Sequence, residues 1–276
     1  MAEPRRPSGL HARLSSRMQW LLGLLPFVLV IGAYLLASGY RLADNPQDKI
    51  LPSLVQMGQA IDRLAFSADA HSGEYVMLQD TLASLRRLGL GVLLAAFVGF
   101  MLGLNMGLLP RVRATLSGFV TFVSMIPPLA VLPVIFISFG VDELAKVMLI
   151  FIGVFPVITR DIFLTVEKLP QEQITKALTL GASQFAVIYR IVMPQILPRL
   201  IDTARLSLGA AWLFLIAAEA IASTDGLGYR IFLMRRYLAM DVILPYVLWI
   251  TLLGFLMDWL LRRLVAWRFE WYLASK

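Results

Sequence analysis

The chain has 276 residues, of which 59% are hydrophobic and 16% are charged, and its mean hydropathy is +0.75. A soluble domain carries about a quarter charged residues, so this apolar excess excludes an ordinary water-soluble fold and indicates a protein whose solvent is lipid. The net charge of +7 does not indicate nucleic-acid binding, because the basic residues lie between apolar runs, as in loops that face anionic lipid.

The first apolar run covers residues 20–38 and follows a basic N-terminal segment, residues 1–19. A cleaved signal peptide is one interpretation, because the small residues Ala-Ser-Gly stand at positions 37–39. However, the run is longer than the roughly 7–15 apolar residues of a signal peptide. We therefore expect a retained transmembrane helix that follows a cytoplasmic N-terminal segment.

Residues 39–80 form a polar segment in which acidic residues outnumber basic ones. This balance indicates the outer side of the membrane. Leu54, Met57, Ile61 and Leu64 recur at helical spacing, which predicts an amphipathic helix lying on the outer membrane face. We interpret this helix as a lid or brace rather than as an element that recognises a ligand.

The second apolar run, residues 88–109, carries a small residue at every fourth position: Gly91, Ala95, Gly99, Gly103 and Gly107. This spacing places them on one face of a helix, where a neighbouring backbone can approach closely. Packing against another helix of the same subunit is the first interpretation, and a seam between two copies of the chain is the second.

The third run, residues 116–139, contains Pro127, Pro128 and Pro133. A proline inside a span removes a helical hydrogen bond, which lipid permits only where neighbours or a cavity satisfy the freed carbonyl groups. We expect a broken helix that lines a pathway, with a purely structural kink as the alternative.

Charged residues are few in the fourth run (144–166) and the fifth (200–222). They are Arg160, Asp161, Arg205 and Glu219. Arg205 and Glu219 lie near opposite ends of the fifth run, where a long side chain can reach the membrane interface. Structural pairing or anchoring is the first interpretation for both, and a position lining the pathway is the alternative.

A sixth run covers residues 242–261 and precedes a basic tail, residues 263–276. We therefore predict an all-α integral membrane protein with about six transmembrane helices, the last five of which form a core over residues 81–262. Basic residues beside the spans place both termini in the cytoplasm. The exceptions are three arginines on the predicted outer side: Arg230, Arg235 and Arg236.

The loop between the fourth and fifth runs, residues 167–198, is hereafter the coupling loop. It is too polar to cross a membrane and too regular in pattern for a linker. Pro170 can begin a helix and Gly181 can end it in a left-handed conformation. A second short helix is expected over residues 183–192, ended by Pro194. Two short helices at a steep angle form a compact projection suited to docking on another protein.

The coupling loop resembles the E-A-A, three residues, G, nine residues, I-x-L-P pattern of permeases in binding-protein-dependent ABC importers. Matching residues are Ala177, Gly181, Ile191 and Pro194, whereas Thr175, Lys176 and Met193 depart from the pattern. Residues 81–110, 124–158 and 204–231 are similar to the nitrate/sulfonate/taurine branch of these permeases.

This resemblance implies a type I importer (MetI-like) fold in a bacterial inner membrane. Two copies of the chain would form the pathway, and a periplasmic binding protein would deliver a small anionic or zwitterionic solute such as a sulfonate, taurine or nitrate. Two cytoplasmic ATPase subunits, which bind the ATP and Mg, would contact the coupling loop. The implied contact residues are Ala177, Leu180, Gly181, Ala182, Ser183, Ile191 and Pro194.

The remaining chemistry agrees with a transport subunit that is not itself an enzyme. The sequence has no G-x-x-x-x-G-K-[ST] phosphate loop and no cysteine, and His11 and His71 lie far apart, so we expect no cofactor, metal site or catalytic residue in this chain. The alternatives are a secondary carrier, which predicts inverted repeats and ionisable residues at the midplane, and an intramembrane enzyme, which needs a paired nucleophile and base.

Overall fold

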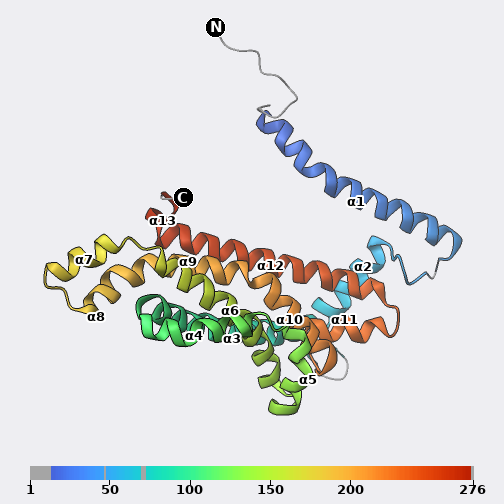
Figure 1. Cartoon of the computed structure of the whole chain (residues 1–276). Coiled ribbons are helices and arrows are strands. Elements are labelled where there is room, and N and C mark those ends of the chain that lie inside the picture. The colour runs from blue at the N-terminus through green and yellow to red at the C-terminus, as the bar shows by residue number, and fades with distance from the viewer. Residues whose placement is uncertain (1–13, 47, 70–72, 275–276) are drawn as a thin grey trace, which may run out of the picture.

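The computed structural model describes residues 14–46, 48–69 and 73–274, and in these ranges all regular secondary structure is helical (Figure 1). Four helices are long and apolar enough to cross a membrane: α1 (Ser16–Asp44), α3 (Val76–Leu108), α6 (Glu143–Glu167) and α12 (Met240–Arg268). Two bent helix pairs raise the number of spans to six if each pair is one span. The prediction of an all-α membrane protein with about six spans is confirmed.

Helix α1 extends beyond the predicted run at both ends and lies apart from the other helices (Figure 1). Ser38 is its buried residue, and the Ser38 hydroxyl donates to the carbonyl oxygens of Leu51 and Pro52 at 3.0 and 3.2 Å. Most of the expected cytoplasmic segment, with His11, lies outside the described residues, as does His71. The loop after α1 therefore folds back and contacts the C-terminal part of α1.

The predicted amphipathic helix is present as α2 (Leu54–Ile61), which continues into a π-helical turn (Asp62–Phe66). A capping box formed by Ser53 and Gln56 begins the helix. Met57 and Ala60 are buried, and α2 packs against α12. These contacts are those of a brace against the main bundle.

Helix α3 begins at Val76, well before the apolar run, so the boundary expected between residues 80 and 81 falls inside a helix. The reason is that Asp80, Ser84 and Arg87 in its first turns are buried and paired with distant parts of the chain, as the next subsection describes. Hydropathy alone does not report such pairing.

The glycine face of α3 packs against α6 along its whole length. A Cβ atom at Gly91 would lie 2.7 Å from Ile150, and one at Gly103 would lie 2.6 Å from the carbonyl oxygen of Thr159. Gly99 and Gly107 meet α6 side chains in the same way. In this chain the small residues therefore allow two helices of one subunit to approach closely.

The third apolar run is two helices, α4 (Pro110–Ser124) and α5 (Pro128–Phe139), which meet at an angle of 99°. Pro127 has an extended backbone and precedes the first residue of α5, while Pro133 lies within α5. Helix α5 projects from the bundle in Figure 1 and buries Leu132 and Ile135. The prolines break the span rather than kink it.

The fifth run is also divided, into α9 (Met193–Leu206) and α10 (Leu208–Ile221), and the helical segment that ends with α9 meets α10 at 44°. No proline stands at this bend. The Ser207 hydroxyl donates to the carbonyl oxygen of Thr203 at 2.9 Å, a pattern that bends helices. Helices α11 (Leu227–Arg235), α12 and α13 (Glu270–Ala274) complete the chain.

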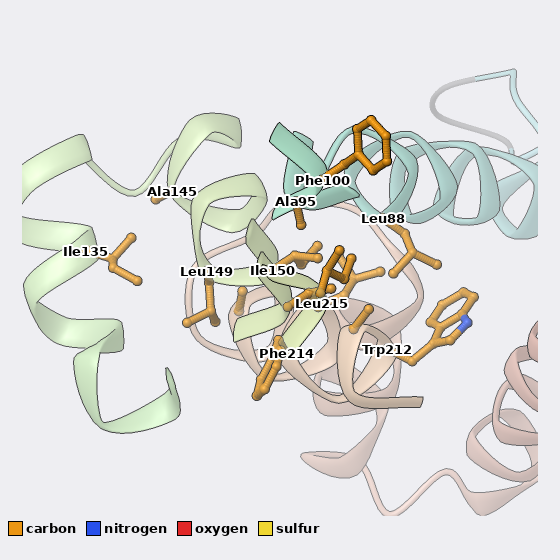
Figure 2. Close-up of a cluster of buried hydrophobic side chains, with 14 of the residues drawn as sticks. Leu88, Ala95, Phe100, Ile135, Ala145, Leu149, Ile150, Trp212, Phe214 and Leu215 are labelled. Carbon is orange, nitrogen blue, oxygen red and sulfur yellow. The ribbon is translucent and has the colours of Figure 1, made fainter. Parts of the chain in front are cut away.

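The hydrophobic core lies where α3, α6 and α10 meet. Figure 2 shows Ile150 of α6 between Ala95 of α3 and Leu215 of α10, all of them fully buried. Phe214 approaches Gly153, where a Cβ atom would lie 2.2 Å from its ring. The core therefore joins the three helices that also carry the charged residues described below.

Candidate functional site

The coupling loop begins with α7 (Gln171–Thr179), which ends in the predicted left-handed turn at Gly181, with φ of +84°. The Gly181 N–H donates to the Leu178 carbonyl oxygen and the Ala182 N–H to that of Ala177, both at 3.0 Å. This is the Schellman arrangement, in which a glycine lets the chain reverse while the last helical carbonyl groups stay bonded.

The second half of the coupling loop differs from the prediction. Ser183 caps α8 (Gln184–Val187) by accepting from the Ala186 N–H at 3.2 Å. Pro194 does not end this helix: a π-helical turn (Ile188–Val192) leads directly into α9, and Pro194 stands in the first turn of α9. A proline is tolerated there because it lacks only a donor that the first turn leaves unpaired.

The tip of the coupling loop is apolar and exposed. Leu180 is 88% exposed and Phe185 is 75% exposed, and the Phe185 ring stacks on that of Tyr189. By contrast, Ala177 and Ile191 are half-buried and pack toward the core. The tip of the coupling loop thus leaves apolar side chains uncovered by the rest of the chain.

Ion pairs join the base of the coupling loop to the bundle. Asp161 of α6 accepts from Arg199 Nε at 2.7 Å and from the Thr203 hydroxyl at 2.5 Å, both on α9. Arg205 donates through Nη1 to Asp258 of α12 at 2.9 Å. Arg205 is thus engaged in a structural pair, whereas Arg160 is exposed.

The opposite end of the bundle, where α10 turns into α11 (Figure 1), holds a buried ionic cluster centred on Arg87 of α3. Arg87 binds the carboxylate of Glu143 of α6 through Nε and Nη2, at 2.7 and 2.6 Å, and Glu219 of α10 through Nη1 at 2.8 Å. It also donates to the carbonyl oxygen of Asp225 at 3.0 Å and to the Asp225 carboxylate. We call Arg87, Glu143, Glu219 and Asp225 the Arg87 cluster.

Glu219 is fully buried and paired, which agrees with the structural interpretation, whereas its carboxylate does not reach the surface that anchoring at the membrane interface would require. Besides Arg87, its carboxylate accepts from the Ser84 hydroxyl at 2.8 Å and from the Gly228 N–H at 2.8 Å. These three partners satisfy a charge that would be costly to bury alone.

A second ion pair with a buried carboxylate lies two helical turns from Arg87, toward the start of α3. Asp80 of α3 accepts from the Gly226 N–H at 2.9 Å, from Arg230 Nε at 2.8 Å and from the Tyr246 hydroxyl at 3.1 Å. Arg230 was one of the arginines that contradicted the charge rule for outer loops. Its charge is neutralised by Asp80, which explains part of that exception.

The sequence interpretation missed Arg87, Ser84 and the buried role of Asp80. A signal was present, because Asp80, Ser84 and Arg87 stand at positions i, i+4 and i+7, on one face of a helix. Of the predicted pathway prolines, Pro127 and Pro133 are exposed and Pro128 is half-buried, all at the α4–α5 break or within α5. They do not meet Arg205 or Glu219 in a common site.

A bundle with broken spans, ion pairs at both ends and an exposed apolar loop is compatible with a multi-pass transport subunit. The chain belongs to the family of binding-protein-dependent transport system inner membrane components, whose model matches residues 91–269. It is accordingly a permease of the ABC transporter class, and the resemblance found in the sequence is confirmed.

Individual relatives agree. The chain is 36% identical over 196 residues to the taurine transport system permease protein TauC of Escherichia coli, covering 70% of this chain and 71% of that one. It is 33% identical to the bicarbonate transport system permease protein CmpB of Synechococcus elongatus, covering 71% and 69%. A chain of the MetNI methionine ABC transporter shares the fold, with a TM-score of 0.57 at 17% identity over 68% of this chain and 96% of that chain.

Proposed function

We propose that two copies of this chain form the pathway by which an ABC importer moves a small sulfonate, such as taurine, across a bacterial inner membrane. The observation that carries the proposal is the coupling loop, whose ordered Gly181 turn presents an exposed apolar tip. The similarity to permeases for taurine and bicarbonate supports a small anionic or zwitterionic solute.

The partners on the cytoplasmic side would be two ATPase subunits, which bind ATP and Mg. Leu180 and Phe185 would enter an apolar groove on each ATPase, and Ser183 and Pro194 would lie at its edge. Burial of such side chains contributes about 25 cal/mol per Å2 of apolar area. On this arrangement the two chain termini are cytoplasmic, and the Arg87 cluster lies at the periplasmic end, where a binding protein would deliver the solute.

The homodimer accounts for the exposed apolar surface of α5, on which Val134 and Ile137 point away from the rest of the chain. A second copy would cover part of this surface, and the break at Pro127 and Pro128 would face the pathway between the copies. Closure of the ATPase pair would move both coupling loops and tilt the attached helices, which requires that ATP bind one state more tightly than the other.

The test is reconstitution of the permease with its ATPase subunits and binding protein in liposomes, with labelled taurine as the probe. We expect uptake that requires both ATP and the binding protein. Uptake driven by an ion gradient in the absence of ATP would instead indicate a secondary carrier. Uptake of bicarbonate or nitrate in place of taurine would keep the transport class and replace the proposed solute.

A further inference from the structure

The Arg87 cluster joins parts of the chain that the sequence separates widely. The five hydrogen bonds of the Arg87 guanidinium reach α6, α10 and the loop after α10. A guanidinium has five N–H donors, so its donor capacity matches the acceptors present. The side chains of Glu143 and Asp225 are about half exposed, at 58% and 48%, whereas that of Arg87 is 3% exposed. The cation is buried although the site is at the surface of the bundle.

These bonds hold one particular segment, residues 222–226, which connects α10 with α11. Asp225 is bound through both its backbone carbonyl and its side chain, and the next two residues, Gly226 and Leu227, donate their N–H groups to Asp80 and Ser84. Gly226 has φ of +109°, and a Cβ atom there would lie 2.5 Å from Glu219 and 2.7 Å from Arg87. Successive backbone groups of this connection are thus bound to α3.

Helix α6 and the bent segment formed by α9 and α10 are joined to each other by ion pairs at both ends. At the end near the coupling loop, Asp161 of α6 binds Arg199 of α9. At the far end, Arg87 bridges Glu143 of α6 and Glu219 of α10. The 44° bend at Ser207 lies between these two connections.

The bend at Ser207 is the point between the two connections at which movement could be absorbed. The residue Gly209 stands directly after it, and a Cβ atom at Gly209 would meet nothing within 4 Å, so close packing does not require this glycine. Glycine increases backbone freedom. Phe214 and Leu215 already hold the middle of α10 to α6 in the core, so the part that a movement of α9 could leave behind is the end of α10 beyond them, with residues 222–226.

We propose that Arg87 is a positioning residue for transport. It holds residues 222–226 and the end of α10 to α3 and α6, so that a movement of the coupling loop reaches the far end of the pathway instead of being absorbed at Ser207. This inference rests on the proposed function, because it assumes that ATPase subunits move the coupling loop. The competing explanation is that Arg87 contributes only to the stability of the fold.

The experiment compares Arg87→Gln with Arg86→Gln, which removes the same charge from the adjacent, exposed position. The chain has no cysteine, so single spin labels can be attached through Glu172→Cys on α7 and Thr224→Cys in the far connection, both at exposed positions. Spectra are recorded from the assembled transporter in lipid nanodiscs, without nucleotide and after trapping with ATP and vanadate.

We expect both labels to respond to nucleotide in the unmodified background and in Arg86→Gln. In Arg87→Gln the label at 172 should still respond, whereas the label at 224 should be mobile in both states. A response at 224 equal to that of the control overturns the proposal. Loss of the response at 172 as well would mean that Arg87 is merely structural, which also overturns it.

Coupled activity gives a second readout, the number of solute molecules imported per ATP hydrolysed. Arg87→Gln should lower this ratio about tenfold, within the usual range of coupling free energies, while hydrolysis continues. Arg87→Lys, which keeps the charge but only three donors, should give an intermediate ratio. Equal losses of uptake and hydrolysis would contradict the proposal. Failure of the unmodified protein to import taurine would concern the proposed function alone, because the spin-label comparison needs no solute.

Discussion

Arg87 of α3 and Glu219 of α10 are 132 residues apart in the sequence, yet Nη1 of Arg87 lies 2.8 Å from Oε1 of Glu219, and both side chains are buried. A buried pair of this kind is weak evidence for stability in itself. Substitution of only one of the two residues is costly, however, because the remaining buried charge then has no adequate partner. The pair therefore allows a test that distinguishes charge balance from packing.

We expect Arg87→Leu to lower the free energy of unfolding by about 3–5 kcal/mol, because it leaves the buried Glu219 carboxylate without its cation. The double variant Arg87→Leu/Glu219→Gln should lose less, since the neutral amide can keep its bonds to Ser84 and Gly228. The measurement is thermal unfolding of the purified protein in detergent. Equal losses in the single and double variants would contradict the assignment of Glu219 as a buried anion.

The glycine face of α3 gives a second prediction with a control on the same helix. Gly103→Ala places a Cβ atom 2.6 Å from the Thr159 carbonyl oxygen, which belongs to the backbone of α6 and cannot move aside alone. We expect a loss of about 1–3 kcal/mol from overpacking. Gly89→Ala meets nothing within 4 Å and should be neutral or stabilising. Detergent unfolding curves of the two variants test this, and equal behaviour would refute close packing at Gly103.

A third prediction concerns pH and the loop after α1, outside the spans. Hydrogen bonds from the Arg41 side chain and the Ile50 N–H hold the pKa of the Asp48 carboxyl below its ordinary value of 3.8. Because the pKa is lowered in the folded state, this pair stabilises the loop at pH values above the ordinary pKa and stops doing so as the pH falls through the folded value. A carboxyl NMR titration of labelled aspartate should show the low midpoint for Asp48, and Arg41→Gln should raise it toward the ordinary value, because the Ile50 N–H bond remains. If Asp48 of the unmodified protein titrated with an ordinary midpoint, the ion pair between Arg41 and Asp48 would be contradicted.

The sequence predicted those features that depend on local chemistry. The turn at Gly181 follows from the left-handed conformation that glycine tolerates, and the break at Pro127 follows from the lost backbone donor. The placement of Gly91, Gly99 and Gly103 at intervals of four or eight residues likewise identified the face of α3 that packs closely. The sequence did not identify the helix that packs against this face.

The features that were missed depend on partners far away in the chain. Residues 76–87 contain Asp80 and Arg87, which lower their hydropathy, and the partners that allow these charges to be buried, Arg230 and Glu219, stand more than a hundred residues later. The bend at Ser207 was missed for a related reason, because no proline marks it. At Pro194 the rule that a proline ends a helix fails, because the π-helical turn Ile188–Val192 places this proline in the first turn of α9.

The last prediction concerns Gly181, where backbone conformation can be separated from contact. Gly181 has φ of +84°, and a Cβ atom there would meet nothing within 4 Å, so a side chain at this position changes the backbone energy and little else. A residue with a Cβ atom costs about 1–2 kcal/mol in the left-handed region, and a β-branched residue is the least tolerated there, whereas asparagine is enriched in it.

We therefore expect Gly181→Val to disturb the coupling loop and to reduce taurine uptake strongly, while Gly181→Asn retains most of it. The amount of each variant in the membrane should be similar, because the turn lies outside the spans. Uptake in liposomes, normalised to the amount of assembled transporter, is the measurement. If valine and asparagine had equal effects, the left-handed turn would not be what transport requires, and the exposed tip at Leu180 and Phe185 would have to act without it.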